Sequence, residues 1–369
     1  MIGFLFSVVA VLVLVGIALV GVGGLGLDIL FGVIIPYAAV LTFFLGLIYR
    51  IIDWAQSPVP FRIPTTCGQE ESLSWIKPNK VDNPCSGGMV LLRMAFEVLT
   101  FRSLFRNMKL DYRQGPKIRY SSEKFLWLFA MMFHWAFLVV LIRHARLFTQ
   151  PIAQWLQTLE HLDGFLEFNL ASWGIGLPTI QISGLVLLGG VSLLLVRRIV
   201  IPGVRYISLA ADWFPLLLII FIALTGILSR YIIRVDVVKI KELAMGLATF
   251  HPVVPDGISV WFYIHFFLVC VLFAYFPFSK LMHLGGVFLS PTRNMVNNSR
   301  AVRHVNPWSY PVKTHDYHEY EDDFREQMVE AGLPVEKTLE EAEAEKAAPA
   351  PAPAEAEPEA QETEEKKED

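Results

Sequence analysis

Six long apolar runs restrict what this 369-residue chain, 54% hydrophobic, can fold into. A helix needs about 20 apolar residues to cross a hydrocarbon core about 30 Å thick. Because lipid offers no hydrogen-bond partners, each run must satisfy its own backbone as a helix. The predicted spans are Ile2–Val22, Asp28–Ile51, Glu123–Phe148, Ile180–Val200, Trp213–Arg234 and Ile258–His283. The sequence therefore predicts an all-α membrane protein, a bundle of about six transmembrane helices.

Composition divides the chain into five predicted parts. Residues 1–51 form an N-terminal transmembrane hairpin, whose first span lacks the basic start and cleavage site of a signal peptide. Residues 52–122 form a basic loop, in which Met89–Lys109 is an amphipathic helix that lies in the membrane interface or docks a partner. Residues 123–283 form a four-helix core, and residues 284–338 a partner-binding tail. Residues 339–369 are rich in Glu, Ala and Pro, cannot bury a core and are predicted to be disordered.

The distribution of Lys and Arg predicts the orientation. The stretch 52–124 is rich in both residues, whereas 149–179 contains neither. We therefore expect the first stretch, and both termini, to lie in the cytoplasm. Four cations on the outer side run against this rule, Arg230, Arg234, Lys239 and Lys241.

Four histidines lie in or beside two of the spans. His134 and His144 are ten residues apart, and His265 and His283 are eighteen apart. Eighteen residues are five full helical turns, about 27 Å, whereas ten residues rise about 15 Å. If the two spans run antiparallel, His144 meets His265 and His134 meets His283, which would give each of two haem irons two imidazoles. The unequal separations leave a mismatch of about 6 Å at each iron, which a bend at Pro277 could absorb.

Other chemistry is less well supported by the sequence. Intramembrane histidines also serve interhelical hydrogen bonds or proton paths, so a haem-free anchor and a proton-conducting subunit stay as alternatives. Acidic residues are missing from the centres of the spans, which weakens the proton path. Three cysteines, Cys67, Cys85 and Cys270, form neither a C-x-x-C pair nor a c-type haem motif. Three glycines of the fourth predicted span, Gly184, Gly189 and Gly190, are expected to serve helix packing.

The histidine spacings, on the second and last helices of a five-helix unit, resemble the dihaem cytochrome b (gamma) subunit of respiratory nitrate reductase. Three further segments narrow the resemblance, Asp212-Trp-Phe-Pro215, Leu224-Thr-Gly-Ile-Leu-Ser-Arg-Tyr231 and the stretch from Ser290 to Trp308. They are similar to the membrane cytochrome of the sulfite-reduction-associated electron transfer complex, and to the cytochrome subunit of membrane heterodisulfide reductase.

The resemblance implies a function, two haem b groups and a set of partners. His144 and His265 would bind the haem far from the cytoplasm, and His134 and His283 the near one. The subunit would exchange electrons between menaquinol or menaquinone and a cytoplasmic iron–sulfur subunit of heterodisulfide-reductase type, alongside other membrane subunits. The setting would be the cytoplasmic (inner) membrane of a prokaryote, in anaerobic respiration of sulfur compounds such as dissimilatory sulfate reduction.

The quinol site does not transfer from this resemblance. The nitrate reductase subunit has a lysine near its quinol site, whereas Leu177–Ser183 contains none. Four other residues could bind a quinone oxygen or a haem propionate here, Arg143, Arg146, Arg230 and Tyr231. For each of them, an interface anchor that reaches out to the lipid headgroups is the alternative.

Overall fold

The computed structural model describes residues 2–57, 79–113, 117–164, 181–297 and 315–347. The chain divides into two compact units, Met1–Trp308 and Ser309–Asp369, which are treated separately below. Parts of three sequence features discussed above fall outside the described residues. They are Cys67, residues 165–179 of the outer-side stretch and the part of the Ser290–Trp308 segment from 298 on.

Six helical segments of the described residues are long and apolar enough to cross a membrane, which confirms the predicted fold class. They are Ile2–Gly23, Leu30–Gln56, Lys124–Phe148, Ile182–Val200, Ala210–Ile232 and Val260–Phe278. Their α-helical parts are α1 (Ile2–Gly23), α2 (Ile35–Gln56), α5 (Lys124–His144), α7 (Ile182–Val200), α9 (Ala210–Ile227) and α11 (Val260–Tyr275). The first two form the predicted N-terminal hairpin, and in the turn between them Gly26 adopts a left-handed backbone conformation with φ of 62°.

The last span ends earlier than predicted. Two 3₁₀ turns, Phe276–Phe278 and Lys280–Met282, follow α11, and His283 begins a separate helix, α12 (His283–Leu289). Residues 276–282 are called the elbow below. Pro277 cannot donate the hydrogen bond that would continue α11. A glycine of α2 accommodates the elbow, because a Cβ added at Gly46 would lie 2.7 Å from Cβ of Pro277. The prediction of one continuous helix from Ile258 to His283 was therefore wrong.

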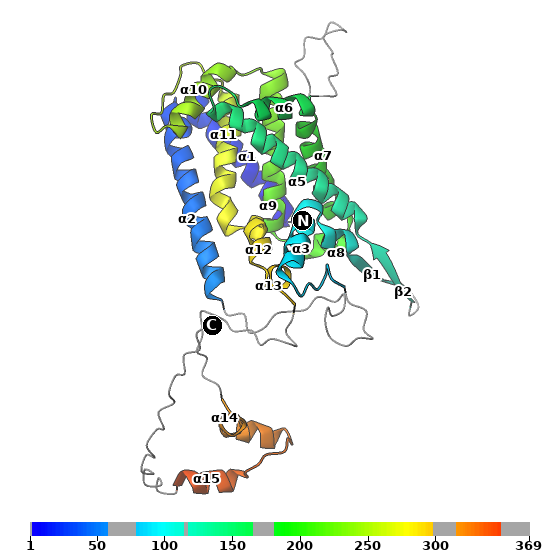
Figure 1. Cartoon of the computed structure of the whole chain (residues 1–369). Helices are drawn as coiled ribbons and strands as arrows, with labels where there is room; N and C mark the ends of the chain where they lie inside the picture. Colours follow the sequence, from blue (N-terminus) through cyan, green and yellow to red (C-terminus); the bar gives the residue numbers. More distant parts are fainter. Residues whose placement is uncertain (1, 58–78, 114–116, 165–180, 298–314, 348–369) are drawn as a thin grey trace, which may run out of the picture. The chain divides into compact units, whose positions relative to one another are not determined.

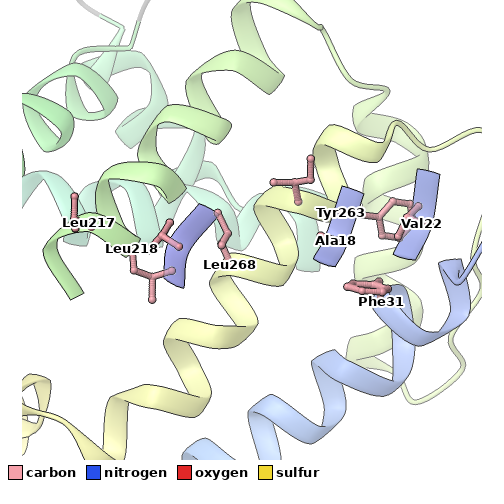
Figure 2. Close-up of a cluster of buried hydrophobic side chains, with 9 residues drawn as sticks. Ala18, Val22, Phe31, Leu217, Leu218, Tyr263 and Leu268 are labelled. Atoms are coloured by element: carbon pink, nitrogen blue, oxygen red, sulfur yellow. The ribbon is translucent and has the colours of Figure 1, made fainter. Parts of the chain in front are cut away.

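The spans of the first unit pack in the order α5, α7, α9, α11 and α2, and α1 packs against α9 and α11 (Figure 1). Their shared core is apolar and includes Ala18 of α1, Leu218 of α9 and Leu268 of α11 (Figure 2). Ser7, fully buried in α1, donates its hydroxyl to the carbonyl of Gly3 at 2.8 Å. The first span, α1, is thus part of the bundle core and packs against α9 and against α11, the helix that carries His265.

Short helices close the two ends of this unit. At one end lie α6 (Gln154–Asp163) and α10 (Val237–Ala248), and we call it the α10 end. At the other lie α3 (Gly87–Thr100), α4 (Arg102–Arg106), α8 (Pro202–Ile207), α12 and α13 (Pro291–Asn294), and we call it the α3 end (Figure 1).

The predicted amphipathic helix over Met89–Lys109 is interrupted. It breaks at Phe101, whose φ is 48°, and continues into an antiparallel hairpin of β1 (Met108–Arg113) and β2 (Lys117–Ser122) that the sequence analysis did not predict. Asp82 accepts hydrogen bonds from Arg102 and Arg106. Although burial alone would raise the pKa of the Asp82 carboxyl, these hydrogen bonds hold it below its ordinary value.

The second unit contains α14 (Tyr317–Glu330) and α15 (Leu339–Ala347). The carboxylate of Glu321 accepts the backbone N–H groups of Glu336 at 2.8 Å and Lys337 at 3.1 Å, which lowers the pKa of this carboxyl. Helix α15 lies in the part of the chain predicted to be disordered. It forms there because Thr338 and Glu341 exchange hydrogen bonds in a capping arrangement at its start. Residues 348–369 lie outside the described part.

The contact between α2 and the elbow can be tested by adding one methyl group. We expect Gly46→Ala to destabilise the protein by about 1–3 kcal/mol, because the rigid ring of Pro277 must move. The matched control is Gly16→Ala in α1, where a Cβ meets nothing within 4 Å. Thermal unfolding in detergent would contradict this account if both variants unfolded at the same temperature.

Candidate functional site

Two pairs of histidine side chains face each other across the bundle. His144, the last residue of α5, lies opposite His265 of α11, with ring centroids 6.4 Å apart and ring planes at 19°. His134, in the middle of α5, lies opposite His283, with centroids 5.9 Å apart and planes at 83°. These are the two pairs that the sequence predicts. Their role as ligands remains a prediction.

The elbow explains how both pairs can form. On α5 the two histidines are separated by a continuous helix, which sets about 15 Å between them. On the other side, His265 and His283 belong to different helices, so the rise of about 27 Å expected for eighteen residues of one helix does not apply. The break in the last span therefore removes the mismatch of about 6 Å at each iron that a continuous helix would have caused.

Each of the four imidazoles is oriented by a backbone carbonyl. The Nδ1 atoms lie within hydrogen-bond distance of the carbonyl oxygens of Ala130 (2.8 Å, from His134), Val140 (2.7 Å, from His144), Ile222 (3.1 Å, from His265) and Lys280 (2.8 Å, from His283). A carbonyl can only accept, so Nδ1 must carry the proton and donate it. The other nitrogen, Nε2, is then left with a free lone pair, as in histidines that bind metals.

The distances between the paired rings fit one metal ion per pair. With about 2 Å from metal to nitrogen and about 1 Å from that nitrogen to its ring centre, two imidazoles that share a metal have centres about 6 Å apart. Among the described residues, none of the four Nε2 atoms has a hydrogen-bond partner. The described part of the chain also brings no three His, Cys, Asp or Glu side chains together as a metal site. Two protein ligands per metal suit haem iron, whose porphyrin supplies the other four.

Neighbouring residues hold these rings in place, and the sequence analysis did not single them out. The hydroxyl of Thr225, on α9, lies 3.1 Å from Nδ1 of His265. Its neighbour Gly226 lets the ring approach, because a Cβ there would lie 3.1 Å from Cε1 of His265. Phe101, at the break between α3 and α4, packs edge-on against His134 with centroids 5.0 Å apart. Thr225 and Gly226 belong to the segment Leu224–Tyr231, which resembles the sulfite-reduction-associated cytochrome, and that was the signal that could have found them.

The glycines of α7 have different surroundings. A Cβ at Gly190 would lie 2.9 Å from the backbone nitrogen of Phe133, so this glycine allows α7 to pack closely on α5, as predicted. A Cβ at Gly184 or Gly189 meets nothing within 4 Å. Helix packing therefore accounts for one of the three positions.

A second group of polar residues lies at the α10 end, around the start of α7. Arg143 donates to Asp163 of α6 at 2.6 Å and to the hydroxyl of Ser183 at 2.9 Å. The backbone N–H of Ser183 donates to Asp163 at 2.7 Å, so this carboxylate also caps the start of α7. Arg146 pairs with Glu160 at 3.0 Å. Two of the four predicted quinol residues are therefore already paired with carboxylates.

The other two lie in a π-helical turn, Leu228–Ile232, which ends the fifth span. The hydroxyl of Tyr231 accepts the backbone N–H of Gln181 at 2.8 Å, and the guanidinium of Arg230 lies 5.7 Å from the centre of the Tyr231 ring. Three buried polar atoms of this cluster lack a hydrogen-bond partner among the described residues, Nε of Arg143, Oε1 of Gln181 and Oγ of Ser229. Unpaired polar atoms inside a protein are unusual and are often found at binding sites.

Comparison with known proteins identifies the family of the chain. Residues 97–304 match the profile of the nitrate reductase gamma subunit family. The chain belongs to this family. The match includes all four paired histidines and begins within α3, so α1 and α2 lie outside it.

Individual relatives narrow the comparison. The chain is 43% identical to the Hdr-like menaquinol oxidoreductase cytochrome b-like subunit of Archaeoglobus fulgidus, over 76% of this chain and 84% of that protein. It is 41% identical to the protein of the same name from Archaeoglobus profundus, over 74% and 81%. A shorter match, 34% identical over 28% of this chain and 49% of the other, is to the respiratory nitrate reductase 1 gamma chain of Escherichia coli.

The ion pair between Arg143 and Asp163 can be tested against its more exposed neighbour. Their side chains are only 13% and 6% exposed, so Asp163→Ala would leave a buried cation with one neutral partner and cost about 3–5 kcal/mol of stability. Glu160→Ala, which removes the partner of the 36% exposed Arg146, should cost at most about 1 kcal/mol. Thermal unfolding in detergent checks both, and equal losses would show that the buried pair has no special weight.

Proposed function

We propose that this chain is a membrane cytochrome b that carries two haem b groups and exchanges electrons between menaquinol or menaquinone and a partner subunit. The paired histidines carry this proposal, because each pair has the separation and the free Nε2 atoms that one iron requires. When bound, the haems would supply one-electron transfer across this apolar region.

Residues of this chain would hold and tune both groups. His144 and His265 would bind one haem and His134 and His283 the other, each fixed by its bond to a carbonyl. Hydrogen bonding at Nδ1 strengthens the imidazole as a ligand. Apolar neighbours such as Phe101 exclude water, and together with the axial ligands they set the reduction potential.

The polar cluster at the α10 end is the proposed quinol site. Arg143, Arg146, Arg230 and Tyr231 line this region, and the unpaired atoms of Gln181 and Ser229 add an acceptor and a hydroxyl. A hydroquinone has two hydroxyl groups to donate, and its quinone has two carbonyls to accept. The position near His144 and His265 supports a site from which electrons enter the first haem.

The α3 end is the proposed docking side for the partner. The names of the two archaeal relatives support a menaquinol-linked complex with a heterodisulfide-reductase-like component. We infer that the partner is a cytoplasmic iron–sulfur subunit of heterodisulfide-reductase type, in anaerobic respiration of sulfur compounds, and that other membrane subunits complete the complex. The basic loop 52–122 and the tail 284–338 would supply complementary charge. We infer that the protein lies in the cytoplasmic (inner) membrane of a prokaryote. The distribution of Lys and Arg supports an orientation with this end and both termini in the cytoplasm.

The haem content of the purified chain tests the central claim. A dithionite-reduced sample should show the absorption band of b-type haem at two haems per chain. His265→Ala and His283→Ala should each remove about half of this signal, because each variant removes one ligand of a different pair. The matched control is His251→Ala, an exposed histidine that should leave the signal unchanged.

Paramagnetic resonance gives a further readout that distinguishes the two haems. The ring planes meet at 83° in one pair and 19° in the other, so the two ferric irons should give distinguishable paramagnetic resonance signals. A chain without any haem would instead be a structural anchor or a proton-conducting subunit, and the cytochrome proposal would be wrong.

The quinol role has its own test. A water-soluble menaquinol analogue should reduce both haems, and Ser229→Ala should slow this reduction about tenfold if its hydroxyl bonds the quinol. The variant should retain two haems per chain. Thr158→Ala, an exposed hydroxyl of α6 at the same end, is the matched control. If the protein contains both haems but the analogue cannot reduce them, the proposed quinol role is wrong and the cytochrome proposal still stands.

A further inference from the structure

A pocket of about 400 Å³ lies between α2, the start of α9 and the elbow, at the α3 end of the bundle. Its size is that of a small-molecule site. Its walls include Arg50, Trp54, Tyr275, Phe278, Lys280 and His283. His283, one of the four paired histidines, therefore lines this pocket. Helix α2 contributes to the pocket wall, whereas α5 does not.

Arg50 brings unused hydrogen-bond donors to the pocket. Its Nε is buried and has no hydrogen-bond partner among the described residues. Its nearest carboxylate, on Asp53, lies 3.8 Å from Nη1, beyond hydrogen-bond distance. The guanidinium lies 5.7 Å from the ring centre of Trp54, which fixes its position. In contrast, Lys280 is already paired with Asp212 at 2.6 Å.

The chemistry of the walls defines what fits. An arginine with free donors binds a carboxylate more strongly than a neutral acceptor, and often through two parallel hydrogen bonds. The surrounding aromatic rings and methionine suit a flat apolar body. Haem combines the two, because its apolar macrocycle carries two propionates.

We propose that Arg50 binds a propionate of the haem held by His134 and His283, and that α2 thereby forms one wall of that haem site. This inference rests on the proposed function. It concerns a helix outside the family match over 97–304, so the comparisons do not assign the role. The contact between Gly46 and Pro277 supports this proposal. It holds α2 close to the elbow, and His283 is the residue that directly follows the elbow.

A cation near an iron should raise the reduction potential, because it opposes the additional positive charge of the ferric state. We therefore expect Arg50→Gln to lower the midpoint potential of one haem and leave the other unchanged. Arg50→Lys keeps the charge and should restore most of the shift. The matched control is Arg205→Gln, an exposed arginine of α8 at the same end, which should change neither potential.

The experiment is an optical redox titration of the purified full chain, with the haem content of every variant measured beside it. The affected haem is identified as the one that His283→Ala removes. If Arg50→Gln instead loses this haem while Arg50→Lys keeps it, the assignment also stands. Two haems with unchanged potentials in Arg50→Gln would overturn it, as would a shift of the haem that His265→Ala removes.

Two other results are equally decisive. If Arg50→Gln changes only the affinity for a quinone analogue, the pocket is a quinone site and the propionate assignment is wrong. If the unmodified chain contains no haem, the proposed function fails first and this inference fails with it.

Discussion

The hydrogen bond from each imidazole to a backbone carbonyl is the interaction on which the site depends. In a lipid-embedded bundle a neutral histidine has one donor and one acceptor, and both need a partner. The carbonyls of Ala130, Val140, Ile222 and Lys280 take the donors. The Nε2 atom of each ring is left as an acceptor, without a hydrogen-bond partner among the described residues. Three of these carbonyls come from the histidine's own turn or the turn before it, so local helix geometry supplies most of the orientation.

Packing within the rest of the bundle fixes the separation between the two helices that carry the facing histidines, α5 and α11. Helix α5 is held by α7, where Gly190 permits a close approach, and α11 is held by α1, α2 and α9. Within the described residues α5 and α11 are not among the closely packed helix pairs. The facing imidazoles are therefore positioned by the helices that pack on the outer sides of α5 and α11, and not by direct contact between α5 and α11.

Much of this could be predicted from the sequence because the strongest constraints are local. Span length and apolar composition predicted six helices, and residue spacing predicted which histidines face each other. The sequence offered a bend at Pro277 but not a break into two 3₁₀ turns and a new helix, because that packing needs Gly46 and Pro277 to meet from distant parts of the chain. The break at Phe101 requires a left-handed backbone at a residue that rarely adopts it. The role of Asp163 could not be predicted, because its partners Arg143 and Ser183 are distant in the sequence and meet it only in the folded chain. The capping pair Thr338 and Glu341 was hidden by a composition typical of disorder.

The elbow makes the two sides of the bundle mechanically unequal. His134 and His144 belong to one continuous helix, so the distance between them is fixed by the helical rise. His265 and His283 are joined through a hinge of 3₁₀ turns and can adjust independently. A movement transmitted through α12 or α13 would therefore shift His283 relative to His134 and leave the pair of His144 and His265 in place.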